Sequence, residues 1–121
     1  LVIDNEPAVL ESMQALLERW GCRVMTATSR VQALERLAQD GGRPDALLVD
    51  YHLDHDLTGF DAIYGVRKYL KADIPAAVIT ADRSDEARSL LRAQYLPALN
   101  KPVKPNRLRA LLTSLLATGT V

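Results

Sequence analysis

A chain of 121 residues, 48% of them hydrophobic, has the length and apolar content of one compact domain. Its fifteen basic and fifteen acidic residues balance at pH 7, which excludes the basic excess that binding nucleic acid or an anionic membrane by charge would need. A single cysteine cannot form an internal disulfide, and no apolar run reaches the ~20 residues of a membrane span or follows a charged leader. We therefore expect a cytoplasmic domain without membrane contact of its own.

Short apolar runs and amphipathic stretches alternate five times along the chain. Between residues 7 and 20, for example, apolar side chains recur at intervals of three and four, as on one face of a helix. In chain order, the pattern predicts a strand over 1–4, a helix over 7–20, a strand over 23–27, a helix after Ser29 that Gly41 ends, a strand over 46–49, a helix from 59 to about 70, a strand over 76–80, a helix over 84–94, a strand over 98–100 and a helix over 105–117.

Local signals support the helix boundaries. Pro7 suits a first helical turn and Ser29 suits a helix cap, because a serine hydroxyl can accept a hydrogen bond from a free backbone N–H. Val31 and Tyr69 are expected among the apolar members of the second and third helices.

The alternation also predicts the fold class. The run over 46–49 is wholly apolar, which is typical of a central strand buried on both faces. Strict alternation of strands and helices indicates parallel strands joined by right-handed crossovers. We expect an α/β, doubly wound, five-stranded parallel sheet flanked by five helices, with its functional site at the carboxyl ends of the strands; the flavodoxin-like order 2-1-3-4-5 is one case of such a sheet.

Polar residues follow four of the five expected strands. Because the carboxyl ends of parallel strands lie at one edge of the sheet, these side chains are expected to converge. They are Asp4 with Asn5 and Glu6, Asp50, Thr80, and Lys101.

The same residues carry a resemblance that covers nearly the whole chain. Leu-Val-Ile-Asp-Asn-Glu-Pro opens the sequence, Asp50 follows Leu-Leu-Val, Gly59 opens the third helix, Val-Ile-Thr-Ala ends at Ala81, and Lys101 precedes Pro102. In this order and spacing, the chain resembles the receiver domains of response regulators. Its Asp-Asn-Glu start and Lys-Pro-Val-Lys-Pro end are most similar to receiver segments of hybrid sensor histidine kinases, so we expect a single domain over 1–121 cut from a longer chain.

The resemblance implies that Asp50 accepts a phosphoryl group from a histidine kinase or a histidine phosphotransfer domain. A carboxylate attacks a phosphoryl group poorly unless a divalent cation offsets the repulsion between the two anions. Mg²⁺ (or Mn²⁺) prefers oxygen ligands, which Asp4 and Asp50 supply. By resemblance, the main-chain carbonyl of His52 and the side chain of Asn5 complete the set, with Glu6 as a further candidate.

Five residues have further roles that the resemblance implies. Lys101, the Thr80 hydroxyl and the backbone N–H of Ala81 are expected to contact the phosphoryl oxygens. His52 and Asp82 are expected to tune the lifetime of the acyl phosphate. The domain would promote its own phosphorylation and dephosphorylation and switch conformation, without being a stand-alone turnover enzyme.

The sequence departs from the usual receiver pattern at the metal site and at the switch. Asn5 stands where a second acid is common, which implies weaker metal binding. Ala98 stands where receivers carry the aromatic ring that moves on activation, and Tyr95 is a nearby substitute to be considered. Asp54 replaces a usual proline and the loop to Gly59 is one residue longer.

Other functions remain open at this point. A degenerate receiver would serve as a docking or dimerisation module without phosphorylation, so self-association is one possible outcome. A phosphatase of the haloacid dehalogenase type would need an acid at position 52, where His52 stands. The cluster of His52, Asp54, His55 and Asp56 resembles a transition-metal set, although alternate side chains on a short loop would point apart.

Overall fold

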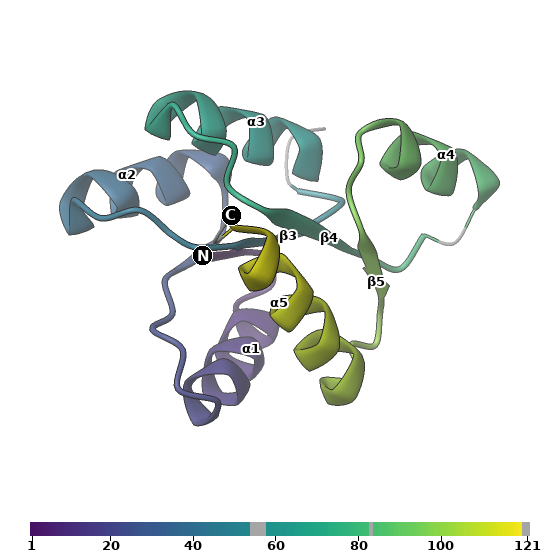
Figure 1. The fold of residues 1–121 in the computed structure, drawn as a ribbon, viewed down its shortest axis with the longest axis horizontal. Coiled ribbons are helices and arrows are strands. Elements are labelled where there is room, and N and C mark those ends of the chain that lie inside the picture. The colour runs from purple at the N-terminus through teal and green to yellow at the C-terminus, as the bar shows by residue number, and fades with distance from the viewer. Residues whose placement is uncertain (54–57, 83, 120–121) are drawn as a thin grey trace.

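The computed structural model describes residues 1–53, 58–82 and 84–119 (Figure 1). Strands and helices alternate throughout, as the sequence pattern predicts. The elements are β1 (Val2–Ile3), α1 (Pro7–Arg19), β2 (Thr26–Ala27), α2 (Arg30–Asp40), β3 (Leu47–Asp50), α3 (Gly59–Leu70), β4 (Ala76–Thr80), α4 (Asp85–Ala93), β5 (Ala98–Asn100) and α5 (Pro105–Gly119).

All five strands form one parallel sheet of order β2-β1-β3-β4-β5, which confirms the predicted doubly wound topology. Helices α2, α3 and α4 cover one face, and α1 and α5 cover the other (Figure 1). Every residue of β3 and β4 is buried, because both faces of these central strands are covered by helices. Among the described helices, none combines the length and apolar character that crossing a lipid bilayer requires.

The expected second strand is longer than the observed one. It was predicted over 23–27, but only Thr26–Ala27 is extended and paired. A strand extends only as far as a neighbouring strand pairs with it. The pairing of β1 with β2 starts at Val2, which lies opposite Thr26, so residues 23–25 precede the paired region. Val31 and Tyr69, apolar members of their helices, are 59% and 49% exposed, since α2 and α3 bury narrower stripes than the full apolar pattern.

Side-chain hydrogen bonds define the helix starts. The Ser29 hydroxyl accepts a hydrogen bond from Gln32 N at 3.1 Å, and the Ser84 hydroxyl accepts one from Ala87 N at 3.1 Å. Gly41 ends α2 with φ of 71°, a left-handed conformation that glycine adopts without a steric penalty.

At the far end of α1, Trp20 packs against the core formed by α1, α5 and the sheet. The guanidinium carbon of Arg109 on α5 lies 5.7 Å from the centre of the Trp20 ring, a cation–π contact that joins the two helices.

Helix α3 begins against the end of β3, where Gly59 lies beside the backbone of Asp50. Gly59 N donates to the Tyr51 carbonyl at 2.8 Å. A Cβ atom at Gly59 would lie 2.6 Å from the Asp50 carbonyl oxygen, a distance that no relaxed structure tolerates. The absence of a side chain at Gly59 therefore lets α3 approach the backbone of Asp50.

We predict that Gly59→Ala lowers the free energy of unfolding by about 1–3 kcal/mol, because the added methyl group must push backbone atoms apart. Urea denaturation measures this. Gly65→Ala is the matched control within α3: its Cβ would meet only the flexible side chain of Arg30, 2.9 Å away at Cδ, and alanine favours helix. Equal losses for the two variants would contradict the steric explanation.

Candidate functional site

The strand registers bring the predicted polar residues to one edge of the sheet. Ile3 pairs with Val49, so Asp4 and Asp50 follow at the ends of neighbouring strands. Asp50 pairs with Ile79, which places Thr80 one residue further along β4. Lys101 N donates to the Thr80 carbonyl at 2.9 Å, which brings Lys101 to the same edge.

Lys101 contacts both buried carboxylates, and we call Asp4, Asp50 and Lys101 the carboxylate site. Its Nζ lies 3.2 Å from Asp50 Oδ1 and 3.4 Å from Asp4 Oδ2. Asp4 is 2% exposed and Asp50 is 5% exposed. Glu6 is more distant and more exposed, with Oε1 4.0 Å from the Lys101 nitrogen. One ammonium group therefore offsets the repulsion between two acids held in a largely dry environment.

Burial raises the pKa of the Asp50 carboxyl, the neighbouring Asp4 raises it further, and Lys101 offsets part of this increase. Burial by itself lowers the pKa of Lys101, but the attraction of Asp50 and Asp4 outweighs it and the net shift is upward. Lys101 therefore stays charged at neutral pH. Ionising the Asp50 carboxyl costs more free energy than ionising a carboxyl group in water.

The two carboxylate oxygens of Asp4 differ in their hydrogen bonding. Oδ1 accepts a hydrogen bond from Glu6 N at 2.9 Å. Oδ2 is buried and accepts no hydrogen bond within the described residues, although it lies within ion-pair distance of Lys101. A buried oxygen that is left without a hydrogen bond, beside a second carboxylate, suits a hard cation.

The donor set fits Mg²⁺ or Mn²⁺ better than zinc. Mg²⁺ takes one or two carboxylates and completes its shell with carbonyl oxygens and water. In the described ranges, no group of three His, Cys, Asp or Glu side chains is arranged to hold a metal ion. Of the alternative cluster, His52 is exposed, while 54–56 lie outside the described residues.

The hydroxyl of Thr80 is engaged with the loop after β4. Thr80 is 2% exposed, and its Oγ1 accepts a hydrogen bond from Asp82 N at 2.9 Å. Asp82 Oδ1 in turn accepts a hydrogen bond from Ser84 N at 2.9 Å, and Ser84 caps α4. A continuous series of hydrogen bonds thus joins the end of β4 to the start of α4. The link through Ser84 was not predicted, although the pattern Asp-x-Ser before a helix indicates such a turn.

The two predicted tuning residues follow neighbouring strands: His52 lies two residues past Asp50 of β3, and Asp82 lies two residues past Thr80 of β4. The backbone N–H of Ser84 holds the pKa of the Asp82 carboxyl below its usual range, its side chain adds to this, and His52 contributes attraction. His52 is exposed, pairs with Thr58 in an isolated antiparallel bridge, and contacts the Tyr51 ring edge-on with centres 4.6 Å apart. Ala81, exposed, follows Thr80, and Asn5 follows Asp4 in a half-buried position.

Neither Ala98 nor Tyr95 provides a packed aromatic ring at the position of the expected switch. Ala98 begins β5 and its side chain is exposed. Tyr95 lies before the strand, is 93% exposed and has a left-handed backbone with φ of 56°. Tyr95 therefore does not take the place of a ring at position 98.

A doubly wound sheet with paired acids and a lysine at its carboxyl edge defines a class of signalling domain, and the comparisons agree. The family model of the response regulator receiver domain matches residues 1–113. The chain belongs to this family and is a receiver domain of two-component signalling.

Two relatives and one structure illustrate the similarity. The chain is 33% identical over 90 residues to the transcriptional regulatory protein KdpE of Mycobacterium tuberculosis, covering 74% of this chain and 38% of KdpE. It is 36% identical over 117 residues to the response regulator MprA of Mycobacterium ulcerans, covering 96% of this chain and 49% of MprA. A receiver domain structure from Clostridium thermocellum superposes with a TM-score of 0.81 at 23% identity, covering 98% and 94% of the two chains. The chain thus spans less than half of either relative.

We predict that Asp50→Asn raises the melting temperature of the metal-free domain at neutral pH. A carboxyl whose pKa is raised by folding contributes stability at low pH and loses it as the pH rises through the folded pKa, so at neutral pH the ionised Asp50 opposes folding. Thermal unfolding followed by circular dichroism tests this. Asp73→Asn, at an exposed acid before β4, is the control and should change little. A lower melting temperature for Asp50→Asn would contradict the prediction.

Lys101→Met should destabilise the domain by roughly 2 kcal/mol, because it leaves two buried acids facing each other; the partial exposure of Lys101 keeps the loss below that of a fully buried pair. The loss should be smaller in an Asp50→Asn background, with a coupling of about 0.5–3 kcal/mol in a double-mutant cycle. Chemical denaturation of the four proteins measures it. Lys68→Met, at an exposed lysine of α3, provides the control. Strictly additive losses would show that Lys101 does not act through Asp50.

Proposed function

We propose that Asp50 is the phosphoacceptor of this receiver domain and that it takes its phosphoryl group from a phosphohistidine. The supporting observation is the carboxylate site: a buried Asp50 that Lys101 contacts at 3.2 Å, with Asp4 at the end of the adjacent strand. The partner is a histidine kinase or a histidine phosphotransfer domain. Placement in a hybrid histidine kinase, and a single domain over 1–121, stay predictions.

In the proposed transfer, an Asp50 carboxylate oxygen attacks the phosphorus of the phosphohistidine. A P–O bond forms, the P–N bond breaks, and the imidazole leaves and takes up a proton. The product is an acyl phosphate on Asp50. Lys101 offsets the added negative charge, and the Ala81 N–H and the Thr80 hydroxyl donate to phosphoryl oxygens.

Asp4 and Asp50 would hold Mg²⁺ or Mn²⁺, with Asn5, the His52 carbonyl and Glu6 as further candidates. Such an ion supplies charge neutralisation that lets two anions approach. Asn5 is neutral, so we expect weaker affinity than a site with three acids would have. Lys101 must share Asp4 with this cation, because the oxygen that accepts no hydrogen bond, Oδ2, is also the one 3.4 Å from the Lys101 ammonium.

The conformational response is proposed to begin at Thr80. The hydroxyl accepts a hydrogen bond from Asp82 N and donates to the Asp82 carbonyl at 3.5 Å, so donation to a phosphoryl oxygen would take its hydrogen away from that carbonyl. Asp82 is hydrogen-bonded to Ser84 at the start of α4, so this change is passed to the loop and to α4. His52 and Asp82, which follow the neighbouring strands β3 and β4, are proposed to set the lifetime of the acyl phosphate by controlling the approach of water.

Incubation with millimolar Mg²⁺ and phosphoramidate should add one phosphoryl group to the protein, seen by intact mass spectrometry. The group should be labile in mild base, and absent in Asp50→Asn or in excess chelator, because the acyl phosphate needs that carboxylate and the cation. Asp73→Asn serves as the matched control and should be modified normally.

Two other outcomes would redirect the assignment. No mass gain at millimolar Mg²⁺ would contradict phosphorylation and favour a degenerate receiver that acts in docking or dimerisation. Steady hydrolysis of phosphate esters would favour a phosphatase.

A further inference from the structure

Three aromatic rings contact one another in sequence between α3 and the end of β3. The Tyr51 ring lies edge-on to the Phe60 ring, with centres 5.5 Å apart and planes at 88°. It also lies edge-on to the His52 ring, with centres 4.6 Å apart and planes at 89°. In this arrangement the positive edge of one ring meets the negative face of another, which stabilises a defined angle as well as a contact. We call Phe60, Tyr51 and His52 the aromatic series.

The central member of the series is fixed by the fold. Tyr51 is buried in the core, and Phe60, half-buried in the first turn of α3, packs against the same core. The Tyr51 N–H donates to the Ile79 carbonyl at 2.9 Å, and the Tyr51 carbonyl accepts a hydrogen bond from Gly59 N at 2.8 Å. Tyr51 is therefore held by β4, by α3 and by the packing of its own ring.

His52, in contrast, lies at the surface. In a regular strand neighbouring side chains point to opposite faces, so the rings of Tyr51 and His52 meet because the backbone bends at residue 51. The backbone of His52 pairs with Thr58 in an isolated bridge. A single bridge orders a backbone weakly. The contact with the buried Tyr51 ring is therefore a second attachment, and it stabilises the bend that aims His52.

We propose that Tyr51 is a positioning residue for the cation site: its ring, held by Phe60, fixes the bend after β3 and with it the main-chain carbonyl of His52. The role rests on the proposed function, in which that carbonyl is a candidate ligand of Mg²⁺ or Mn²⁺. Groups behind the ligands control metal affinity, because a ligand that is already in place loses less conformational freedom on binding. Since Asn5 is neutral, the site depends more on well-placed uncharged oxygens, and Mg²⁺ tolerates little departure from octahedral geometry.

Mn²⁺ titrations of the unphosphorylated domain, followed by electron paramagnetic resonance of the free ion, test this role. Tyr51→Leu keeps an apolar side chain in the core but removes the ring, and it should weaken Mn²⁺ binding by about tenfold, as substitutions behind metal ligands do. Tyr51→Phe keeps the ring and should bind Mn²⁺ as the wild-type domain does. Phe60→Leu removes the ring that holds Tyr51 and should give a smaller loss of affinity. Circular dichroism verifies that each variant is folded.

A double-mutant cycle shows whether Tyr51 acts through His52. His52→Ala keeps the main-chain carbonyl but removes the ring contact, so it should also lower the Mn²⁺ affinity. Because both substitutions break the same contact, the double variant should bind about as well as Tyr51→Leu alone. If Tyr51→Leu does not fold, Phe60→Leu and His52→Ala still test the role. Ile74→Val, in the same core but before β4, is the control for lost packing and should leave the affinity unchanged.

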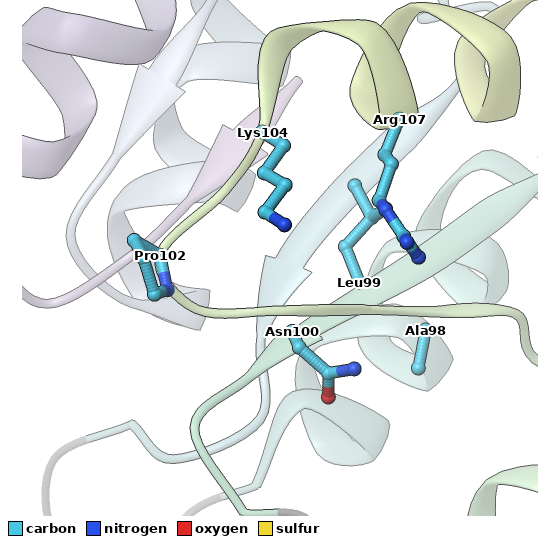
Figure 2. A pocket seen from close by; sticks show the side chains of 6 residues that line it. All are labelled: Ala98, Leu99, Asn100, Pro102, Lys104 and Arg107. Atoms are coloured by element: carbon cyan, nitrogen blue, oxygen red, sulfur yellow. The ribbon is translucent and has the colours of Figure 1, made fainter.

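A surface control comes from the hollow of about 200 Å³ beside β5, whose six lining residues include no aromatic ring (Figure 2). Arg107 reaches toward β5 there, and Arg107→Gln removes one positive charge outside the aromatic series, so the affinity should not change. Wild-type affinity in Tyr51→Leu, an equal loss in Tyr51→Phe or Ile74→Val, or strictly additive losses in the cycle would overturn the role of Tyr51 and leave the cation site intact. Absence of Mn²⁺ binding by the wild-type domain would overturn both.

Discussion

Much of this domain depends on one lysine between two buried acids. Asp4 and Asp50 come from neighbouring strands, and without the Lys101 ammonium their repulsion would act directly on the edge where three strands end. The compensation is incomplete, since the pKa of Asp50 is still raised. The fold thus holds the Asp50 carboxylate where its negative charge is only partly compensated. The same three side chains therefore determine both the stability of the domain and the reactivity of Asp50. A cation arriving at Asp4 would relieve a repulsion that already exists, which gives a physical reason why an ion of this kind suits the site.

The fold was largely predictable because its signals are local and repeat. Alternating apolar runs and helical faces indicated a doubly wound parallel sheet, and the wholly apolar 46–49 run correctly indicated a central strand. Strand length was less predictable. β2 is short because its paired length depends on the position of β1, and this tertiary arrangement cannot be read from residues 23–27 alone. Likewise, Val31 and Tyr69 are apolar residues at helical positions that the neighbouring elements leave uncovered.

The site was predictable in its members but not in its contacts. Parallel strands bring Asp4, Asp50 and Lys101 to one edge, so proximity followed from topology. Lys101 bridging both acids, and Thr80 turned toward the Asp82 backbone, follow from loop conformations that have no periodic signal. The close contact between Gly59 and the Asp50 carbonyl is similar: a glycine at a helix start is visible in the sequence, but its steric necessity appears only when β3 and α3 are placed together.

The position of the lone tryptophan determines which spectroscopic measurements can report on this domain. Helix α1 starts after Glu6 at the carboxylate site and runs 13 residues to Arg19, which carries Trp20 about 20 Å away. There the indole is packed against the core and stacked with Arg109. Tryptophan fluorescence should therefore follow separation of α1 from α5 during unfolding and remain nearly silent to events at Asp50. A fluorescent readout of cation or phosphoryl binding would require a second indole placed beside the carboxylate site.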